Sequence, residues 1–209
     1  MSDAPRGNGF PHLDSDSPGL YFDSHFGMHA AKISPGELYA SQRNILIVTV
    51  LGSCVSACLI DPVARIGGMN HFMLPDRSGS HSVVSEPARY GAHAMEMLIN
   101  NLLRMGANRE RLVAKVFGAG RVLPGMSDVG ARNAQFALDY LSREGITVTA
   151  KDVGGNHARK VYFFVETGRV LVKEIRQLHN DTLIDRERAY AVEIEKKAVS
   201  SRGVELFGD

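Results

Sequence analysis

Short apolar runs separated by turn signals dominate the first half of the chain. Residues 55–60 and 65–74 are both mainly apolar, and the segment between them begins with Asp-Pro, a turn signal. The pattern predicts two antiparallel strands joined by the loop 61–64. In this hairpin Ile60 pairs with Arg65, and each further pair follows from that one.

This register places Cys54 directly opposite His71. Directly opposed residues have Cβ atoms about 4.5–5.5 Å apart on one face of a sheet, which brings a thiol within reach of an imidazole. A shift of one residue would move His71 to the other face. A bulge at Gly67-Gly68, inside the second strand, is where such a shift could arise.

The rest of the chain shows further strand patterns and amphipathic helices. Strands are predicted for residues 29–33, 37–40, 45–51, 112–117, 146–153, 160–165 and 169–175, and helices for residues 87–105, 128–143 and 181–199. Several hairpins with little strict alternation of strand and helix predict an α+β fold. We expect a layered α/β sandwich with a mixed β-sheet and outer helices.

The helical patterns also predict which faces are buried. Helix 87–105 carries an apolar stripe at helical spacing, formed by Tyr90, Ala94, Met97, Leu98, Leu102 and Met105. Helix 181–199 is rich in Arg, Glu and Lys, which is typical of a solvated helix face and not of a nucleic-acid patch.

Composition narrows the class of protein. The chain has 209 residues, 44% of them hydrophobic and 22% charged, as in an ordinary globular protein of one domain. The net charge of +1 gives no general attraction to nucleic acid. Apolar runs are too short for a membrane helix, and the first residues lack the pattern of a signal peptide. Two cysteines fit a reducing compartment, so we expect a cytoplasmic protein without membrane insertion.

A Cys–His pair supports nucleophilic catalysis for a definite chemical reason. The thiolate is the nucleophile, and a neighbouring imidazole can take the thiol proton and return it to the leaving group. Gly52 and Ser53, directly before Cys54, allow a tight backbone whose N–H groups could form an oxyanion hole. Cys54 and His71 are therefore candidate catalytic residues.

Other interpretations of these side chains remain open from the residues alone. Cys54 and Cys58 could be small buried hydrophobic residues, the usual situation of a free cysteine. A metal site of Cys54, Cys58 and His71 is a weaker alternative, because one C-x3-C pair is a poor zinc signature. His81, in a long polar segment, is a rival base.

Five separated strings resemble one known family. They are LGSCVSACLIDP and GGMNHFMLP in the central hairpin, KVFGAG at 115–120, VGARNAQ at 129–135, and DVGGNHARKV…ETGRVLV at 152–172. In this order they resemble the chemoreceptor glutamine deamidase family, CheD, over residues 30–175. This is far more specific than a lone Cys–His pair.

The resemblance implies a fold, an activity and partners. Members are similar in fold to bacterial toxins that deamidate glutamine, with a layered α/β sandwich. They hydrolyse glutamine side chains of methyl-accepting chemotaxis receptors to glutamate, as amidohydrolases of the protein-glutamine glutaminase type, with no metal or organic cofactor. Some members also bind the chemotaxis phosphatase CheC.

The resemblance also implies roles for three residues. Cys54 matches the nucleophile and His71 the base, and Thr49, in the preceding strand, matches the third member of the triad. Another neighbour or a main-chain carbonyl is the alternative group to orient His71. The rival functions are a non-catalytic adaptor that binds receptors or the phosphatase, and another thiol amidohydrolase.

The resemblance and composition together predict three regions. Residues 1–18 are expected to form a flexible arm, residues 19–177 a CheD-like deamidase domain, and residues 178–209 a helical C-terminal extension. A receptor helix is a large substrate, so an open groove is expected, with residues 76–91 and 154–159 as its walls.

Overall fold

The computed structural model describes residues 19–75, 86–122, 129–175 and 182–200. Within these ranges the chain forms two five-stranded sheets, three α-helices and a short 3-10 helix, η1 (Arg109–Arg111). None of the helices in the described ranges carries an apolar stretch long enough to cross a membrane. The predicted N-terminal arm lies outside the described residues.

The first sheet has the strand order β1-β2-β4-β9-β10. Its strands are β1 (Gly19–Asp23), β2 (Met28–Lys32), β4 (Leu46–Leu51), β9 (Ala158–Phe164) and β10 (Val170–Ile175). β2 and β4 are parallel and the other pairs antiparallel, including the predicted hairpin of β9 and β10. Strand β1 was not predicted, because it is an edge strand whose Phe22 is exposed and shows no clear apolar alternation.

The second sheet has the strand order β3-β6-β5-β7-β8. Its strands are β3 (Leu38–Ser41), β6 (Ile66–Asn70), β5 (Val55–Asp61), β7 (Val113–Gly118) and β8 (Thr147–Val153). β7 and β8 are parallel and the other pairs antiparallel. Both sheets are therefore mixed.

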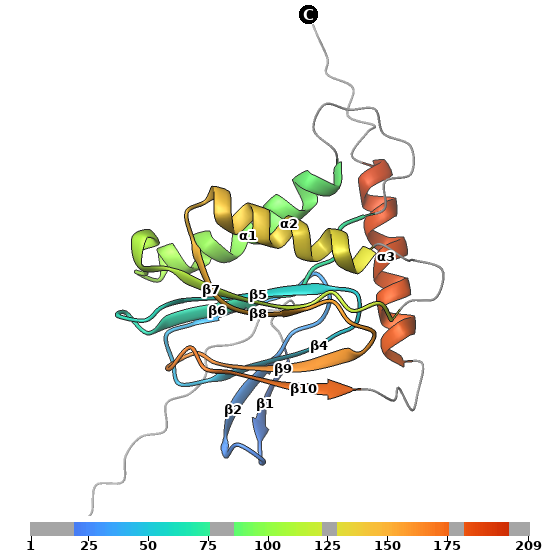
Figure 1. Cartoon of the computed structure of the whole chain (residues 1–209). Coiled ribbons are helices and arrows are strands. Elements are labelled where there is room, and N and C mark those ends of the chain that lie inside the picture. Colours follow the sequence, from blue (N-terminus) through green and yellow to red (C-terminus); the bar gives the residue numbers. More distant parts are fainter. Residues whose placement is uncertain (1–18, 76–85, 123–128, 176–181, 201–209) are drawn as a thin grey trace, which may run out of the picture.

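The layers stack as helices, second sheet and first sheet (Figure 1). Helices α1 (Glu86–Arg104) and α2 (Val129–Arg143) cover the outer face of the second sheet, over a core cluster that includes Leu98, Ile99 and Leu141. A second cluster, with Ile47 and Phe163, fills the space between the sheets. The predicted α+β sandwich with mixed sheets and outer helices is confirmed.

Helix α1 buries a slightly different stripe from the predicted one. Leu98 and Leu102 are buried as expected, but Met97 is 37% exposed, so that part of the prediction was wrong. The buried stripe also contains Met95 and Ile99. These positions follow each other at intervals of three and one, which leaves Met97 on the flank of the helix.

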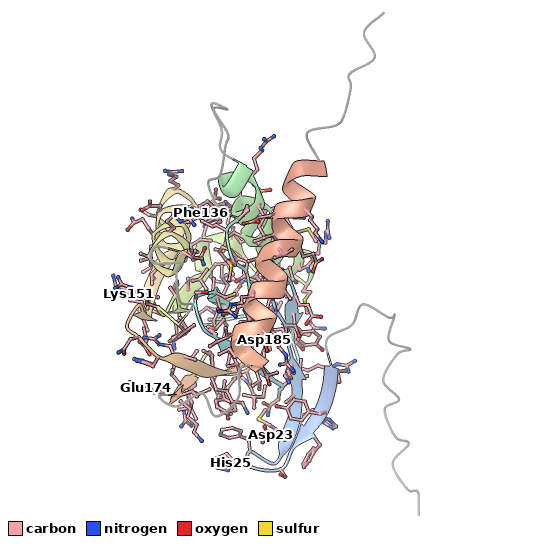
Figure 2. All side chains as sticks on the ribbon, turned by 90° about the vertical axis from the view of Figure 1, so that its right-hand side faces the viewer. Asp23, His25, Phe136, Lys151, Glu174 and Asp185 are labelled. Carbon is pink, nitrogen blue, oxygen red and sulfur yellow. The ribbon has the colours of Figure 1, made fainter. Side chains whose placement is uncertain are left out.

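Helix α3 (Thr182–Ser200) stands beside the stack, across the ends of both sheets (Figure 1). In Figure 2 it faces the viewer, with Asp185 labelled in its first half. Its predicted helical character is confirmed, but its charged sequence does not leave every charged side chain in solvent. Glu187 is fully buried, and Tyr190, Ala191 and Ile194 on the same face of the helix are buried nearly completely.

The central hairpin forms, but its predicted register was wrong. Asp61 pairs with Ile66 and Ile60 pairs with Gly67, so Ile60 does not pair with Arg65. The register is displaced by two residues, and the loop is residues 62–65.

A buried aspartate explains the displacement. The carboxylate of Asp61 accepts hydrogen bonds from the backbone N–H groups of Val63 and Ala64, at 3.0 and 3.1 Å. This Asx-type turn keeps Asp61 inside the strand. The chain then leaves the turn through Arg65, which has a positive φ of 55°.

The displacement has a simple consequence for the candidate catalytic pair. A bridge joins Val55 to Phe72, so His71 lies opposite Ser56, and the predicted direct opposition of Cys54 and His71 was wrong. A shift by two residues keeps the same face of the sheet, so Cys54 and His71 become diagonal neighbours. The β5–β6 pairing runs regularly through both glycines of β6, without the bulge considered for that position.

Candidate active site

The candidate site lies where the chain passes from one sheet to the other. Residues 52–54, called the β4–β5 loop below, connect β4 of the first sheet to β5 of the second. Cys54 ends this loop, His71 follows β6, and Thr49 lies in β4. All three side chains are buried at the end of the sandwich. The structure therefore brings together the three residues that the sequence singled out.

The carbonyl groups of the β4–β5 loop all have donors in the surrounding structure. Gly120 N–H donates to Gly52 O at 2.7 Å, Ala119 N–H donates to Cys54 O at 2.6 Å, and Asn133 Nδ2 donates to Ser53 O at 2.8 Å. These contacts come from the end of β7 and from α2. Because they fix the carbonyls, they also fix the direction in which the N–H groups of the loop point.

The N–H groups of the loop converge on one carboxylate, that of Glu187 in α3. Oε1 accepts from Gly52 N at 2.7 Å and from Cys54 N at 3.3 Å. Oε2 accepts from Ser53 N at 2.8 Å and from the Ser53 hydroxyl at 2.6 Å. Successive backbone N–H groups that point to one place form a site for negative charge, which is the geometry that an oxyanion hole requires.

Hydrogen bonds assign the tautomer of His71. The Thr49 hydroxyl donates its one hydrogen to the carbonyl of Ile33 at 2.8 Å. Thr49 Oγ1 also lies 2.7 Å from His71 Nδ1, so it must accept a hydrogen bond from Nδ1–H. The lone pair of the neutral imidazole is therefore on Nε2, which is buried and has no hydrogen-bond partner among the described residues. His71 is oriented as a base.

The thiol, the imidazole and the carboxylate form one compact group. One ligand atom each of Cys54, His71 and Glu187 lies within 4.8 Å of the other two. Burial lowers the pKa of His71 to about 3, so the ring is neutral at neutral pH. The pKa of the Cys54 thiol is raised well above its usual value, first by burial and then by the Glu187 carboxylate. With Glu187 in place, the pair is a neutral thiol beside a neutral imidazole.

The same three side chains could in principle ligate a metal ion, but the hydrogen bonds do not favour one. Both Glu187 oxygens already accept N–H or O–H groups, whose positive ends favour an anion at that place. The metal set considered from the sequence also included Cys58. Among the described residues, the one group with metal-ligand proximity contains Cys54, His71 and Glu187 and leaves Cys58 out.

Cys58 lies within the core between the two sheets. It is buried, and burial raises the pKa of its thiol far above the usual value. A protonated thiol in such surroundings behaves as a small hydrophobic side chain.

The two segments predicted as walls of the substrate groove, residues 76–91 and 154–159, differ in how far the structure describes them. Residues 76–85, which include His81, lie outside the described residues, and residues 86–91 belong to the first turns of α1. The segment at 154–156 lines a cavity of about 500 Å³ together with the start of α2. That cavity adjoins the β4–β5 loop, because Arg121 N–H donates to Gly155 O next to the Gly120–Gly52 contact.

Sequence reasoning missed Glu187. A signal for it does exist in α3, where Ile184, Glu187, Ala191 and Ile194 recur at helical spacing. A carboxylate in the middle of an apolar stripe must find donors when the stripe is buried. The high charge of the rest of the helix concealed this stripe.

Comparisons with known proteins point to one family. The family model described as CheD chemotactic sensory transduction matches residues 73–174. The chain is 52% identical to the probable chemoreceptor glutamine deamidase CheD 1 of Shewanella oneidensis, over 93% of this chain and 95% of that protein. It is 55% identical to the probable chemoreceptor glutamine deamidase CheD of a Janthinobacterium, over 90% of this chain and 94% of that protein.

The coverage of these relatives includes the site. A match over 93% of the chain leaves too few residues unmatched for Thr49, Cys54 or His71 to lie outside it. Among solved structures, the Bacillus licheniformis hypothetical protein YfiH is similar with a TM-score of 0.35 and 17% identity, over 55% of this chain and 49% of that one, which is too remote to carry an argument.

Proposed function

The chain belongs to the CheD family, and we propose that it deamidates selected glutamine side chains of methyl-accepting chemotaxis receptors to glutamate. One observation carries this proposal above all: backbone N–H groups, a thiol and a neutral imidazole with a free Nε2 meet at one place. These are the parts that a thiol amidohydrolase needs. The proposed enzyme class is protein-glutamine glutaminase.

The first half of the reaction forms a thioester and releases ammonia. His71 Nε2 takes the Cys54 proton, and the thiolate attacks the carboxamide carbon of the substrate glutamine. The oxygen of the tetrahedral intermediate accepts hydrogen bonds from the N–H groups of the β4–β5 loop, where Glu187 oxygens now lie. His71 then protonates the leaving nitrogen, and the carbon–nitrogen bond breaks.

The second half restores the enzyme. With the ammonia gone, His71 deprotonates a water molecule, which attacks the thioester carbon. The carbon–sulfur bond breaks, the glutamate product forms, and Cys54 regains its proton. Throughout, the Nδ1–H of His71 stays bonded to Thr49, whose own hydrogen is held by Ile33 O. Thr49 thus acts as a positioning residue for the base.

The protonation states of the two side chains have a common cause. Burial lowers the pKa of His71 to about 3, which leaves Nε2 free to accept a proton throughout the physiological range but also weakens the imidazole as a base. The Cys54 pKa is raised partly by Glu187, so replacing that carboxylate by a neutral carboxamide removes one of the groups that oppose the thiolate.

The decisive experiment compares wild type with Cys54→Ala on a receptor cytoplasmic domain. Conversion of glutamine to glutamate is mapped by mass spectrometry, and Cys58→Ala is the matched control, since both residues are buried free cysteines. We expect conversion by wild type and by Cys58→Ala, and none by Cys54→Ala. Conversion by Cys54→Ala would exclude Cys54 as the nucleophile. No conversion by wild type would favour the adaptor hypothesis.

A second variant separates chemistry from receptor binding. His71→Ala is expected to lose turnover while it binds the receptor domain with nearly unchanged affinity, measured by calorimetry. Loss of binding together with turnover would show that His71 has a structural role instead.

Two finer expectations accompany the proposal. The receptor domain that serves as substrate is cytoplasmic, so we infer a cytoplasmic location for the enzyme. Binding of the chemotaxis phosphatase CheC stays a prediction, which co-purification with the purified phosphatase would test.

A further inference from the structure

Helix α3 presents to the site the chemical group that the proposed reaction produces. The product is a glutamate side chain on a helix, and Glu187 is a glutamate side chain on a helix. Its carboxylate accepts hydrogen bonds from all three N–H groups of the β4–β5 loop and from a serine hydroxyl. One of its oxygens is within 4.8 Å of Cys54 Sγ.

The rest of α3 is seated as a bound helix would be. Tyr190 donates to or accepts from the hydroxyl of Tyr90 in α1, and its ring lies over Gly36, where an added Cβ would be 3.1 Å from a ring carbon. Ala191 and Ile194 enter the core cluster between the sheets. The contact face of α3 thus runs from Glu187 through the positions three, four and seven residues later, which is one face of a helix. Figure 2 shows α3 lying lengthwise over this end of the molecule.

The loop is fitted closely to the side chain that it holds. A Cβ added to Gly52 would lie 2.7 Å from Glu187 Oε2 and 2.5 Å from Val122 Cγ2. The glycine therefore leaves room for one carboxylate or carboxamide group and for little else. A carboxamide has the same planar shape as a carboxylate, so its oxygen can take the position of Oε1. Its NH2 group, at the position of Oε2, can donate to the Ser53 hydroxyl but cannot accept from the Ser53 N–H.

We propose that α3 is an intramolecular mimic of the product: it occupies the groove that receives a receptor helix, and substrate binds when α3 leaves. This proposal rests on the proposed function, whose substrate it specifies further. The substrate is a helix with its glutamine in the position of Glu187 and with apolar side chains three, four and seven residues after it. The docked form of the chain is closed to substrate.

The proposal predicts a reaction that the natural chain cannot perform on itself. In Glu187→Gln, the docked side chain is a carboxamide in the N–H nest beside Cys54. The Cys54 thiolate would attack its carbon, ammonia would leave with a proton from His71, and water would hydrolyse the thioester to give glutamate at position 187. The sum is one amide and one water converted to one acid and one ammonia.

Self-deamidation is measured by mass spectrometry of the peptide that contains residue 187. In purified Glu187→Gln we expect glutamate at this position, formed at a rate independent of protein concentration. The double variant Cys54→Ala/Glu187→Gln should keep the glutamine. Glu193→Gln is the matched control, since Glu193 is exposed on the same helix, and its glutamine should persist.

Accessibility of the thiol gives a readout that does not depend on catalysis. Iodoacetamide should alkylate Cys54 slowly in wild type and at least about tenfold faster in Glu187→Ala, because α3 loses the charge-assisted hydrogen bonds that hold it down. Cys58 is the internal reference, since it is buried in the core. If both cysteines gained reactivity equally, the effect would be unfolding and the docking proposal would be wrong.

The outcomes separate this proposal from the proposed function. If Glu187→Gln deamidates receptors but keeps glutamine at 187, α3 is not seated as product, and the inference is overturned while the enzyme activity stands. If wild type fails on receptors yet Cys54 alkylation rises selectively in Glu187→Ala, α3 does cover the site and the substrate assignment is what fails. Equal alkylation of Cys54 in wild type and Glu187→Ala overturns the inference in either case.

Discussion

Two buried carboxylates lie at opposite ends of strand β5, and they are held in different ways. Asp61, at the end of β5, accepts from the backbone of Val63, Ala64 and Asn108, and it forms a bidentate ion pair with Arg111. Glu187, at the start of β5, accepts from the three N–H groups and the serine hydroxyl of the β4–β5 loop.

The difference concerns where the carboxylate comes from. Asp61 belongs to the strand itself, and two of its donors are only two and three residues away, so it cannot leave without unfolding the turn. The donors of Glu187 are 133 to 135 residues away in sequence, and the carboxylate belongs to a separate helix. The first arrangement is a structural anchor, and the second can exchange its occupant.

The largest effect on stability is expected at the anchored end. Asp61→Ala removes a buried carboxylate that holds Arg111 and three partly buried N–H groups, and it should lower the free energy of unfolding by about 3 kcal/mol. Urea denaturation monitored by circular dichroism measures this loss. Arg65→Ala is the control, because its ion pair with Glu166 is exposed and should contribute less than about 1 kcal/mol. Equal effects of the two substitutions would contradict the assignment of Asp61 as an anchor.

The two ends of β5 should lose their contributions to the free energy of unfolding in different pH ranges. The folded pKa of His71, about 3, is below the unfolded value of about 6.5, so the unfolded chain binds its proton first. The stability from neutral His71 is fully present above about pH 6.5 and falls by about 2 kcal/mol at pH 5. Denaturation curves of wild type and His71→Gln, recorded above about pH 6.5 and at pH 5, measure this loss. The free energy of unfolding of the variant should fall less between the two conditions.

At the anchored end the loss begins at lower pH. The Arg111 guanidinium, with further help from backbone N–H groups, holds the pKa of Asp61 well below its usual range. Its contribution is complete above about pH 4, the unfolded value, and is lost only as the pH falls further toward the folded pKa. If the free energy of unfolding of Asp61→Ala fell below about pH 4 with the same pH dependence as that of wild type, Asp61 would not be the group responsible.

A smaller effect is expected for the group that orients the base. Thr49→Val removes the acceptor for His71 Nδ1–H and should lower kcat about ten- to a hundredfold, with a smaller change in KM. Thr49→Ser keeps the hydroxyl and should restore most of the activity. Steady-state kinetics with a receptor domain measures both. If serine and valine were equally impaired, the role of Thr49 would be packing and not orientation.

The smallest effect on stability is expected at the exchangeable end. Glu187→Ala should change the free energy of core unfolding by less than about 1 kcal/mol, because water can reach the N–H groups once α3 moves away. Urea denaturation compares this variant with Asp61→Ala. A loss as large as that of Asp61→Ala would show that α3 is an integral part of the core.

Local patterns were enough for much of the fold and part of the site. The apolar runs of β4 and β5 and the periodicity of α1 and α2 placed these elements to within one or two residues. Cys54 and His71 were found because a thiol and a histidine in apolar runs are chemically unusual. Thr49 entered through the family resemblance, and only the structure shows its contact with His71.

What the sequence could not supply depends on contacts between distant segments. The register of the central hairpin depends on Asp61, which forms a local turn with Val63 and Ala64 and an ion pair with Arg111. Arg111 lies 50 residues away, and no local pattern contains that partner. The edge strand β1 lacks a buried face of its own, so it has little pattern to detect. Met97 was misplaced because the exact stripe of α1 depends on how the helix is rotated against β6.

The sequence by itself determined the strands other than β1, the helices, the α+β class and the candidate Cys–His pair, because periodicity and reactive side chains are local properties of a chain. Only the tertiary structure decided which nitrogen of His71 is free, where the N–H groups of the β4–β5 loop point, and what they hold. Those properties arise where β4, β5, β6 and α3 meet, and a glutamate of a charged helix becomes part of the site only when the helix is docked there.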